Sequence, residues 1–159
     1  MVSCGEKKEK EQIKLTDQPA ESTESVTEVK STQDENVVEI TITGNDQMQF
    51  NLAELKVKAG QTVRLTLKHV GKMDKNVMGH NWVLLTKGTD MGAFGLVAVE
   101  AKATDYVPAG TDKVIAHTKL LSGGESDTIE FVAPAAGTYD FICSFPGHYA
   151  LMKGKFIVE

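Results

Sequence analysis

From residue 37 to the C-terminus, apolar and polar residues alternate in short runs that are separated by Gly, Pro and Asp. In the run VVEITITG (37–44) every second residue is aliphatic, and TVRLTLKH (62–69) repeats this pattern. Alternation with a period of two places the aliphatic side chains on one face of an extended strand. Six further runs are candidate strands: LKVKAG, HNWVLL, KVIAHTK, DTIEFVAP, GTYDFIC and GKFIVE.

Eight short strands in about 120 residues, with turn signals between them, predict an all-β protein folded as an antiparallel sandwich. One stretch departs from this pattern. Residues 90–106, DMGAFGLVAVEAKATDY, have apolar residues at helical spacing and are rich in alanine. We therefore predict one short helix here, packed outside the sandwich.

Residues 1–36 have a different composition from the rest of the chain. They contain no Phe, Trp or Tyr, and their five lysines and nine acidic residues give a net charge of −4. So few apolar groups cannot offset the entropy lost on ordering. We predict a disordered, flexible, charged N-terminal tether over residues 1–36 and a folded domain over residues 37–159. The alternative is a docked amphipathic helix through EKKEKEQIKL, whose apolar positions are sparse.

The start of the chain, MVSCGEKKEK, resembles the first residues of a mature bacterial lipoprotein with an added methionine. On this reading Cys4 carries a lipid that attaches the chain to a membrane, and the alternative is a stray exposed cysteine. No apolar run approaches the length needed to span a bilayer. The net charge of −5, with no basic stripe, argues against nucleic acid as a partner.

The stretch FICSFPGHYALMKGKF (141–156) gathers Cys143, His148 and Met152 in one loop between the last two predicted strands. A fourth candidate ligand, His80, opens a predicted strand directly after Gly79. Two imidazoles and a thiolate, with a more distant thioether, suit a blue-copper electron-transfer centre better than a structural zinc site. Taken singly, each residue has an ordinary alternative, because a lone cysteine or methionine is usually core and a loop histidine is usually solvated.

Four segments in order, GNDQMQF, KNVMGHNWVL, VIAHTKL and FPGHYALMKG, resemble the azurins, a family of bacterial type 1 blue copper proteins within the cupredoxins. The resemblance covers residues 37–159. It implies an eight-stranded Greek-key β-sandwich that holds one copper ion, cycling between Cu(I) and Cu(II). It also implies the ligand set: His80, Cys143 and His148 in the equatorial plane, Met152 as a long axial ligand, and the carbonyl of Gly79 on the opposite side.

The resemblance assigns roles around the ligands as well. Asn81 ties the two ligand loops together, and its backbone N–H and that of Phe145 donate hydrogen bonds to the sulfur of Cys143. Trp82 is a packed core residue. An apolar patch around His148 contains Met48, Met78 and Phe145, although Met48 could equally be core.

Two histidines are not expected to bind copper: His117 lies at the surface, and His69 is partly buried and can couple to the copper potential. The sequence departs from the azurins at Val38 and at residues 60–61, where the cysteines of their usual disulfide should fall.

These features predict an electron-transfer protein that shuttles single electrons through a mononuclear type 1 copper site. The alternative function is a copper carrier or storage module, and zinc occupancy would be an artefact of preparation. We do not expect an enzyme, because only His69 and His117 would remain to build a second copper centre. The expected partners are redox proteins such as c-type cytochromes, and the expected location is the periplasm or the outer cell surface.

Overall fold

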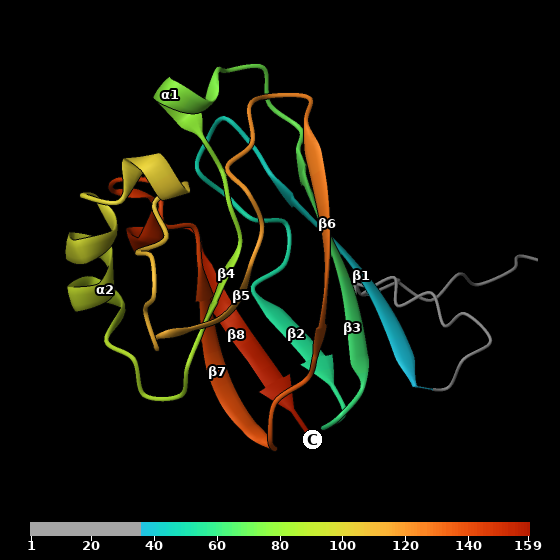
Figure 1. The fold of residues 1–159 in the computed structure, drawn as a ribbon. Helices are drawn as coiled ribbons and strands as arrows, with labels where there is room; N and C mark the ends of the chain where they lie inside the picture. Colours follow the sequence, from blue (N-terminus) through green and yellow to red (C-terminus); the bar gives the residue numbers. More distant parts are fainter. Residues whose placement is uncertain (1–35) are drawn as a thin grey trace, which may run out of the picture.

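The computed structural model describes residues 36–159, which form two packed β-sheets with short helices at one side and one end (Figure 1). The predicted tether, apart from Asn36, and the candidate lipid site Cys4 lie outside the described residues. The eight strands are β1 (Val37–Gly44), β2 (Glu54–Val57), β3 (Thr62–His69), β4 (Val83–Leu85), β5 (Val114–His117), β6 (Ser126–Val132), β7 (Gly137–Ile142) and β8 (Lys153–Val158). Each lies within or beside one of the eight runs predicted from the sequence, so the eight-stranded sandwich is confirmed.

The strands form a three-stranded sheet in the order β1-β3-β6 and a five-stranded sheet in the order β2-β8-β7-β4-β5. The prediction of a purely antiparallel sandwich was wrong, because β1 pairs with β3 and β2 pairs with β8 in parallel. Alternation along a strand fixes which face is buried but carries no information about the direction of the neighbouring strand.

The core lies between the two sheets. The three-stranded sheet contributes the aliphatic residues of β1 and β3 to this core. The side of the five-stranded sheet contributes Trp82, Phe141 and Phe156. Trp82 is completely buried, and its ring lies 5.6 Å from that of Phe141. This packing confirms the expected role of Trp82 as a core residue.

Helix α2 (Met91–Ala98) covers the outer face of the five-stranded sheet, where Phe94 and Ala98 pack on Val83 and Leu85 of β4. The carboxylate of Asp90 caps the helix by accepting the N–H of Ala93 at 2.7 Å. The prediction of one short helix in this stretch, packed outside the sandwich, is confirmed, although the helix covers only the first part of residues 90–106. A 3₁₀ turn, η1 (Lys102–Thr104), follows, and then two residues with positive φ, Asp105 and Tyr106, which no right-handed helix can include.

Two further short helices were not predicted: α1 (Lys75–Met78), capped by Asp74, and the 3₁₀ turn η2 (His148–Ala150). Both adjoin candidate ligands, since α1 ends one residue before Gly79 and η2 begins at His148. Among the described residues, no helix is both long enough and apolar enough to cross a membrane.

Candidate metal centre

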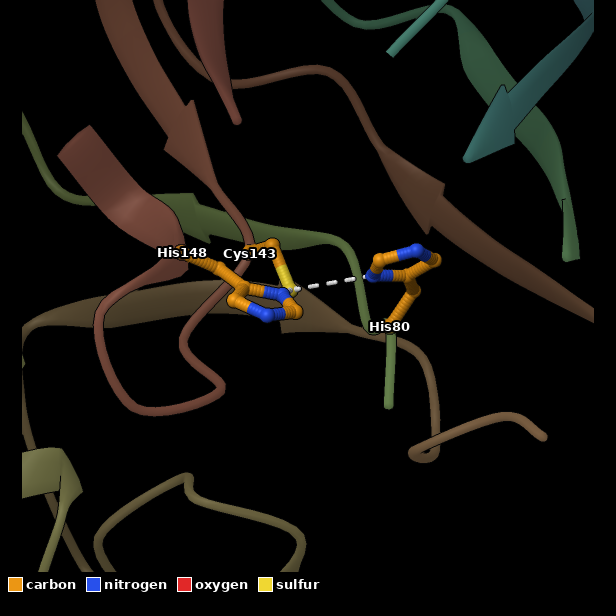
Figure 2. A group of neighbouring side chains, drawn as sticks. All are labelled: His80, Cys143 and His148. Carbon is orange, nitrogen blue, oxygen red and sulfur yellow. Dashed lines mark hydrogen bonds between the residues drawn. The ribbon is translucent and has the colours of Figure 1, made fainter. Parts of the chain in front are cut away.

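Three of the predicted ligands, His80, Cys143 and His148, meet in the interior at one end of the sandwich (Figure 2). The Sγ atom of Cys143 lies 3.9 Å from Nδ1 of His80 and 3.6 Å from Nδ1 of His148. All three side chains are buried, with exposed fractions of 0%, 0% and 3% in sequence order. Residues that are 63 and 5 positions apart in the chain thus present three donor atoms to one point.

The ligand loop is held closed by its own backbone. Cys143 directly follows β7, and its N–H donates to the carbonyl of Met152 at 2.9 Å. The N–H of His148 donates to the carbonyl of Phe145 at 3.0 Å, and that of Met152 donates to the carbonyl of His148 at 2.7 Å. These bonds place the thiol and the imidazole of one short loop on the same side.

His80 reaches the site differently from what the sequence suggested. It does not open a strand, because β4 begins only at Val83. Instead His80 forms an isolated β-bridge with Leu121, which its N–H and carbonyl both contact. Its ring atom Nε2 lies 2.7 Å from the carbonyl oxygen of Asn45. Because a carbonyl can only accept, Nε2 carries the proton and Nδ1 presents a lone pair toward Cys143.

These donors fit a metal ion of copper or zinc size. Metal–nitrogen bonds of about 2.0 Å and metal–sulfur bonds of about 2.3 Å in a trigonal plane put nitrogen and sulfur about 3.7 Å apart. The two observed distances, 3.6 and 3.9 Å, lie on either side of this value. A thiolate with two imidazoles favours copper over the closed four-ligand sets of structural zinc.

The two predicted axial groups lie beside this set. The carbonyl oxygen of Gly79 is 3.8 Å from Sγ of Cys143. The side chain of Met152 is fully buried and packs with Cys143 and Phe145. A Cβ atom on Gly44 would lie only 3.2 Å from Cε of Met152 and 2.9 Å from Cδ2 of His80, so both side chains press against this glycine. Axial ligation by Gly79 and Met152 stays a prediction.

Burial sets the protonation of the metal-free site. It raises the pKa of the Cys143 thiol to about 12, although the backbone N–H groups of Asn81 and Phe145 oppose the shift by hydrogen bonding to the sulfur. These are the two donors that the resemblance to the azurins implied. Burial lowers the pKa of His148 to about 4, helped by the charges of His80 and His69. It also lowers the pKa of His80, so both imidazoles are neutral at pH 7.

Asn81 joins the two ligand segments, as predicted. Its Oδ1 accepts the N–H of Ser144 at 2.8 Å, and its Nδ2 donates to Oγ of Ser144 and to the carbonyl of Asp105. The hydroxyl of Ser144 in turn donates to the carbonyl of Tyr106 at 2.7 Å. The sequence reading missed Ser144 and the segment at Asp105, because backbone acceptors leave no signature in the sequence.

The remaining predicted positions are also located. His69 is buried, and its ring stacks on that of His80 with centroids 4.2 Å apart. His117 is exposed. Met48 and Met78 are half-buried, while Phe145 lies 4.6 Å from the ring of His148. Within residues 36–159 the only cysteine, Cys143, is free, so this part of the chain has no disulfide.

Comparison with known proteins gives a consistent result. The family described as copper binding proteins, plastocyanin/azurin family, matches residues 36–159. The azurin of Achromobacter denitrificans is 50% identical over 122 residues, which cover 73% of this chain and 80% of that protein. The azurin of Bordetella pertussis is 52% identical over 120 residues, covering 72% of this chain and 79% of that protein.

A solved structure of auracyanin A, described as a "blue" copper protein from Chloroflexus aurantiacus, superposes with a TM-score of 0.71. It is 38% identical in sequence, and the match covers 77% of this chain and 99% of that chain.

Proposed function

The chain belongs to the plastocyanin/azurin family of copper-binding proteins, and from this premise we propose that it carries single electrons through one type 1 copper ion held by His80, Cys143 and His148. The observation that carries the proposal is the donor set itself: one buried thiol with the Nδ1 atoms of two neutral imidazoles at 3.6 and 3.9 Å. Copper bound there supplies a one-electron couple whose two oxidation states share one set of soft and borderline ligands.

The chain's own residues keep the donor atoms in place when the charge changes. His80 is fixed by the carbonyl of Asn45 and by the stacked ring of His69. Asn81 links both ligand segments through Ser144. Hydrogen bonds from Asn81 and Phe145 to the sulfur withdraw charge from it, which favours the reduced state. Little has to rearrange, as fast electron transfer requires.

The experiment that tests the metal site is a visible absorption titration of the metal-free chain with Cu(II), repeated on Cys143→Ser and on His117→Ala. We expect an intense blue band that saturates at one equivalent, is lost in Cys143→Ser and is unchanged in His117→Ala, whose ring is exposed. A weak, pale band in the unaltered chain would mean that the thiolate does not ligate copper, and the proposal would fail.

A copper carrier or storage module is the competing function. Carrier sites tend to be exposed, whereas all three donors here are at most 3% exposed. Voltammetry and metal transfer to a chelator separate the two functions. A shuttle shows a fast, reversible couple and slow loss of copper, while a carrier shows rapid transfer of the metal. An enzyme with a second copper centre is not supported, since His69 is buried against His80 and His117 is exposed and does not belong to the group of donor residues.

We propose redox proteins such as c-type cytochromes as partners. The ring of Phe145 lies 4.6 Å from that of His148, and Met48 packs against the cluster that contains Phe145. With Met78 these residues form the expected docking patch, since an apolar, weakly charged surface favours brief contacts. Stopped-flow mixing of the reduced chain with an oxidised c-type cytochrome tests this. A rate that Met48→Lys lowers severalfold would support docking at this patch, and an unaffected rate would contradict it.

We further propose that the domain works in the periplasm or at the outer cell surface, attached through a lipid on Cys4, as the lipoprotein-like start suggests. The test is membrane fractionation of a bacterium that expresses the protein, with Cys4→Ser as the control. Recovery of the Cys4→Ser protein in the soluble fraction, and of the unaltered protein with membranes, would support the anchor. Equal distribution of the two would refute it.

A further inference from the structure

The carboxylate of Asp46 joins two loops that each orient a histidine at the metal centre. Its Oδ2 atom accepts the N–H of Lys72 at 2.8 Å, and its Oδ1 atom accepts the N–H of Met73 at 3.4 Å. These hydrogen bonds hold the pKa of Asp46 below its ordinary value, so the carboxylate is ionised at neutral pH. The side chain of Asp46 thus binds two residues that lie 26 and 27 positions further along the chain.

The first loop carries the hydrogen-bond acceptor of a ligand. The carbonyl of Asn45, one residue before Asp46, accepts the Nε2 proton of His80 at 2.7 Å. The Oδ1 atom of Asn45 also accepts the N–H groups of Gln47 and Gln49, which fixes the turn. The direction of the Asn45 carbonyl therefore depends on where residues 45–49 are held.

The second loop orients the ring that stacks on the ligand. The N–H of Gly71 donates to Nδ1 of His69 at 3.1 Å, and Nε2 of His69 donates to the carbonyl of Met78 at 2.7 Å. The ring so placed lies 4.2 Å from that of His80, at an interplanar angle of 28°. Movement of residues 71–73 would release this ring from its stacked position.

Gly71 makes the close approach of the two loops feasible. A Cβ atom at this position would lie 2.0 Å from Oδ1 and 2.4 Å from Cγ of Asp46, well inside van der Waals contact. The two loops also meet at one backbone pair, in which the N–H of Val70 donates to the carbonyl of Gly44 at 2.8 Å. The Asp46 carboxylate extends that contact by two further hydrogen bonds beyond the ends of β1 and β3.

From this geometry we propose that Asp46 is a positioning residue of the metal centre: its carboxylate locks residues 45–49 onto residues 71–73 and thereby fixes the ring of His80 from two sides. A carboxylate that accepts backbone N–H groups forms stronger hydrogen bonds than a neutral acceptor. Partners behind a metal-ligating histidine set its ring orientation and tautomer. The proposal rests on His80 being a ligand, as the proposed function requires, but not on electron transfer.

The test is solvent exchange of the Nε2 proton of His80, measured by NMR in the full chain, both metal-free and in the diamagnetic Cu(I) form. Asp46→Ala removes both hydrogen bonds, and we expect exchange to be about tenfold faster, as for the loss of a hydrogen bond to a charged group. Asp46→Asn keeps one acceptor oxygen and should fall between Asp46→Ala and the unaltered chain. Gly71→Ala displaces the carboxylate without removing it and should resemble Asp46→Ala.

Asp90→Ala is the matched control. Asp90 is an exposed carboxylate that likewise accepts a backbone N–H, that of Ala93 at 2.7 Å, but it caps α2 on the outer face of the five-stranded sheet and joins neither of the two loops. Its exchange rate should match that of the unaltered chain. The amide proton of Ala133, which donates to the carbonyl of Gln61 at 2.8 Å near the start of β3, at the end of that strand away from the two loops, is the internal reference, because general loosening of the fold would speed its exchange too.

Unchanged exchange of the His80 proton in Asp46→Ala would overturn the proposal. Equal acceleration in Asp90→Ala, or parallel acceleration of the Ala133 amide, would overturn it as well, since either would indicate general loosening of the fold. If Asp46→Ala does not fold, Asp46→Asn and Gly71→Ala decide on the same readout. Failure of the proposed function would appear instead as a missing blue band, with this exchange pattern unaffected.

Discussion

The pH dependence of metal binding follows directly from the protonation of the buried site. In the metal-free chain the pKa of Cys143 is about 12, that of His148 is about 4, and that of His80 is also below its ordinary value. Near neutral pH the thiol is therefore protonated, and both imidazoles are in their neutral form. Because a metal binds the thiolate and the neutral rings, binding must expel one proton, and it comes from Sγ.

One proton released per ion fixes the magnitude. Between about pH 6.5 and 9 the affinity for a divalent ion should rise tenfold per pH unit, about 1.4 kcal/mol, and hence about a hundredfold from pH 7 to 9. Toward pH 4 the slope should increase as the His148 ring takes up a proton of its own. Zn²⁺ is the suitable probe, because it is redox-silent and accepts the same donors.

The assay is competition against a chelator of known affinity at several pH values, with proton release measured by calorimetry in two buffers of different ionisation enthalpy. Cys143→Ser is the control, and its affinity should change little over the same range. A slope near zero in the unaltered chain would show that the thiolate already exists without metal. A slope of two would show that an imidazole is still protonated at neutral pH, and either result would refute the reasoning.

Three further outcomes are expected. The metal-free fold should lose about 3 kcal/mol of stability in chemical denaturation as the pH falls from 6.5 to about 4, because His148 has a higher pKa in the unfolded chain and is protonated there before it is protonated in the folded chain. A copper-loaded chain that lost as much stability would contradict this. His69→Leu should keep its copper while the pH dependence of its reduction potential flattens, and an unchanged pH profile in voltammetry would remove the idea that the stacked ring is coupled to the site. Gly95→Ala should lower the stability by about 1–3 kcal/mol in thermal unfolding, because its Cβ would lie 2.5 Å from the ring of Tyr149, whereas Gly92→Ala in the same helix should not; equal effects would argue against overpacking as the cause.

The strands of the three-stranded sheet were predictable because burial along them is periodic. In β3 the residues Val63, Leu65 and Leu67 are completely buried and the residues between them are not, as the alternation indicates. The pairing partners were less accessible, since β1 and β3 are parallel although both read as ordinary half-buried strands. Partner choice depends on how the whole sandwich closes, which no single run of residues encodes.

At the metal centre, side chains were easier to predict than backbone groups. His80, Cys143 and His148 stand out because soft donors are scarce in this chain. The groups that orient them, such as the carbonyls of Asn45 and Asp105, have no residue-type signature, because any residue offers the same carbonyl. The helix fills only the first part of residues 90–106. The carbonyls of Asp105 and Tyr106, both with positive φ, accept side-chain hydrogen bonds from Asn81 and Ser144, a tertiary arrangement that the helical spacing does not reveal.

The contacts around His80 indicate that the site takes its shape when the chain folds. The ring is in contact on one face with His69, its Nε2 proton is held by Asn45, and one edge lies so close to Gly44 that a side chain there would not fit. None of these contacts involves the donor atom Nδ1, which is left facing Cys143. The entropy of ordering the ligand is therefore spent in folding and not in metal binding. A ring fixed on three sides also has little freedom to move when the charge of the site changes. The contacts that form the site before a metal binds are therefore the same contacts that keep its rearrangement small.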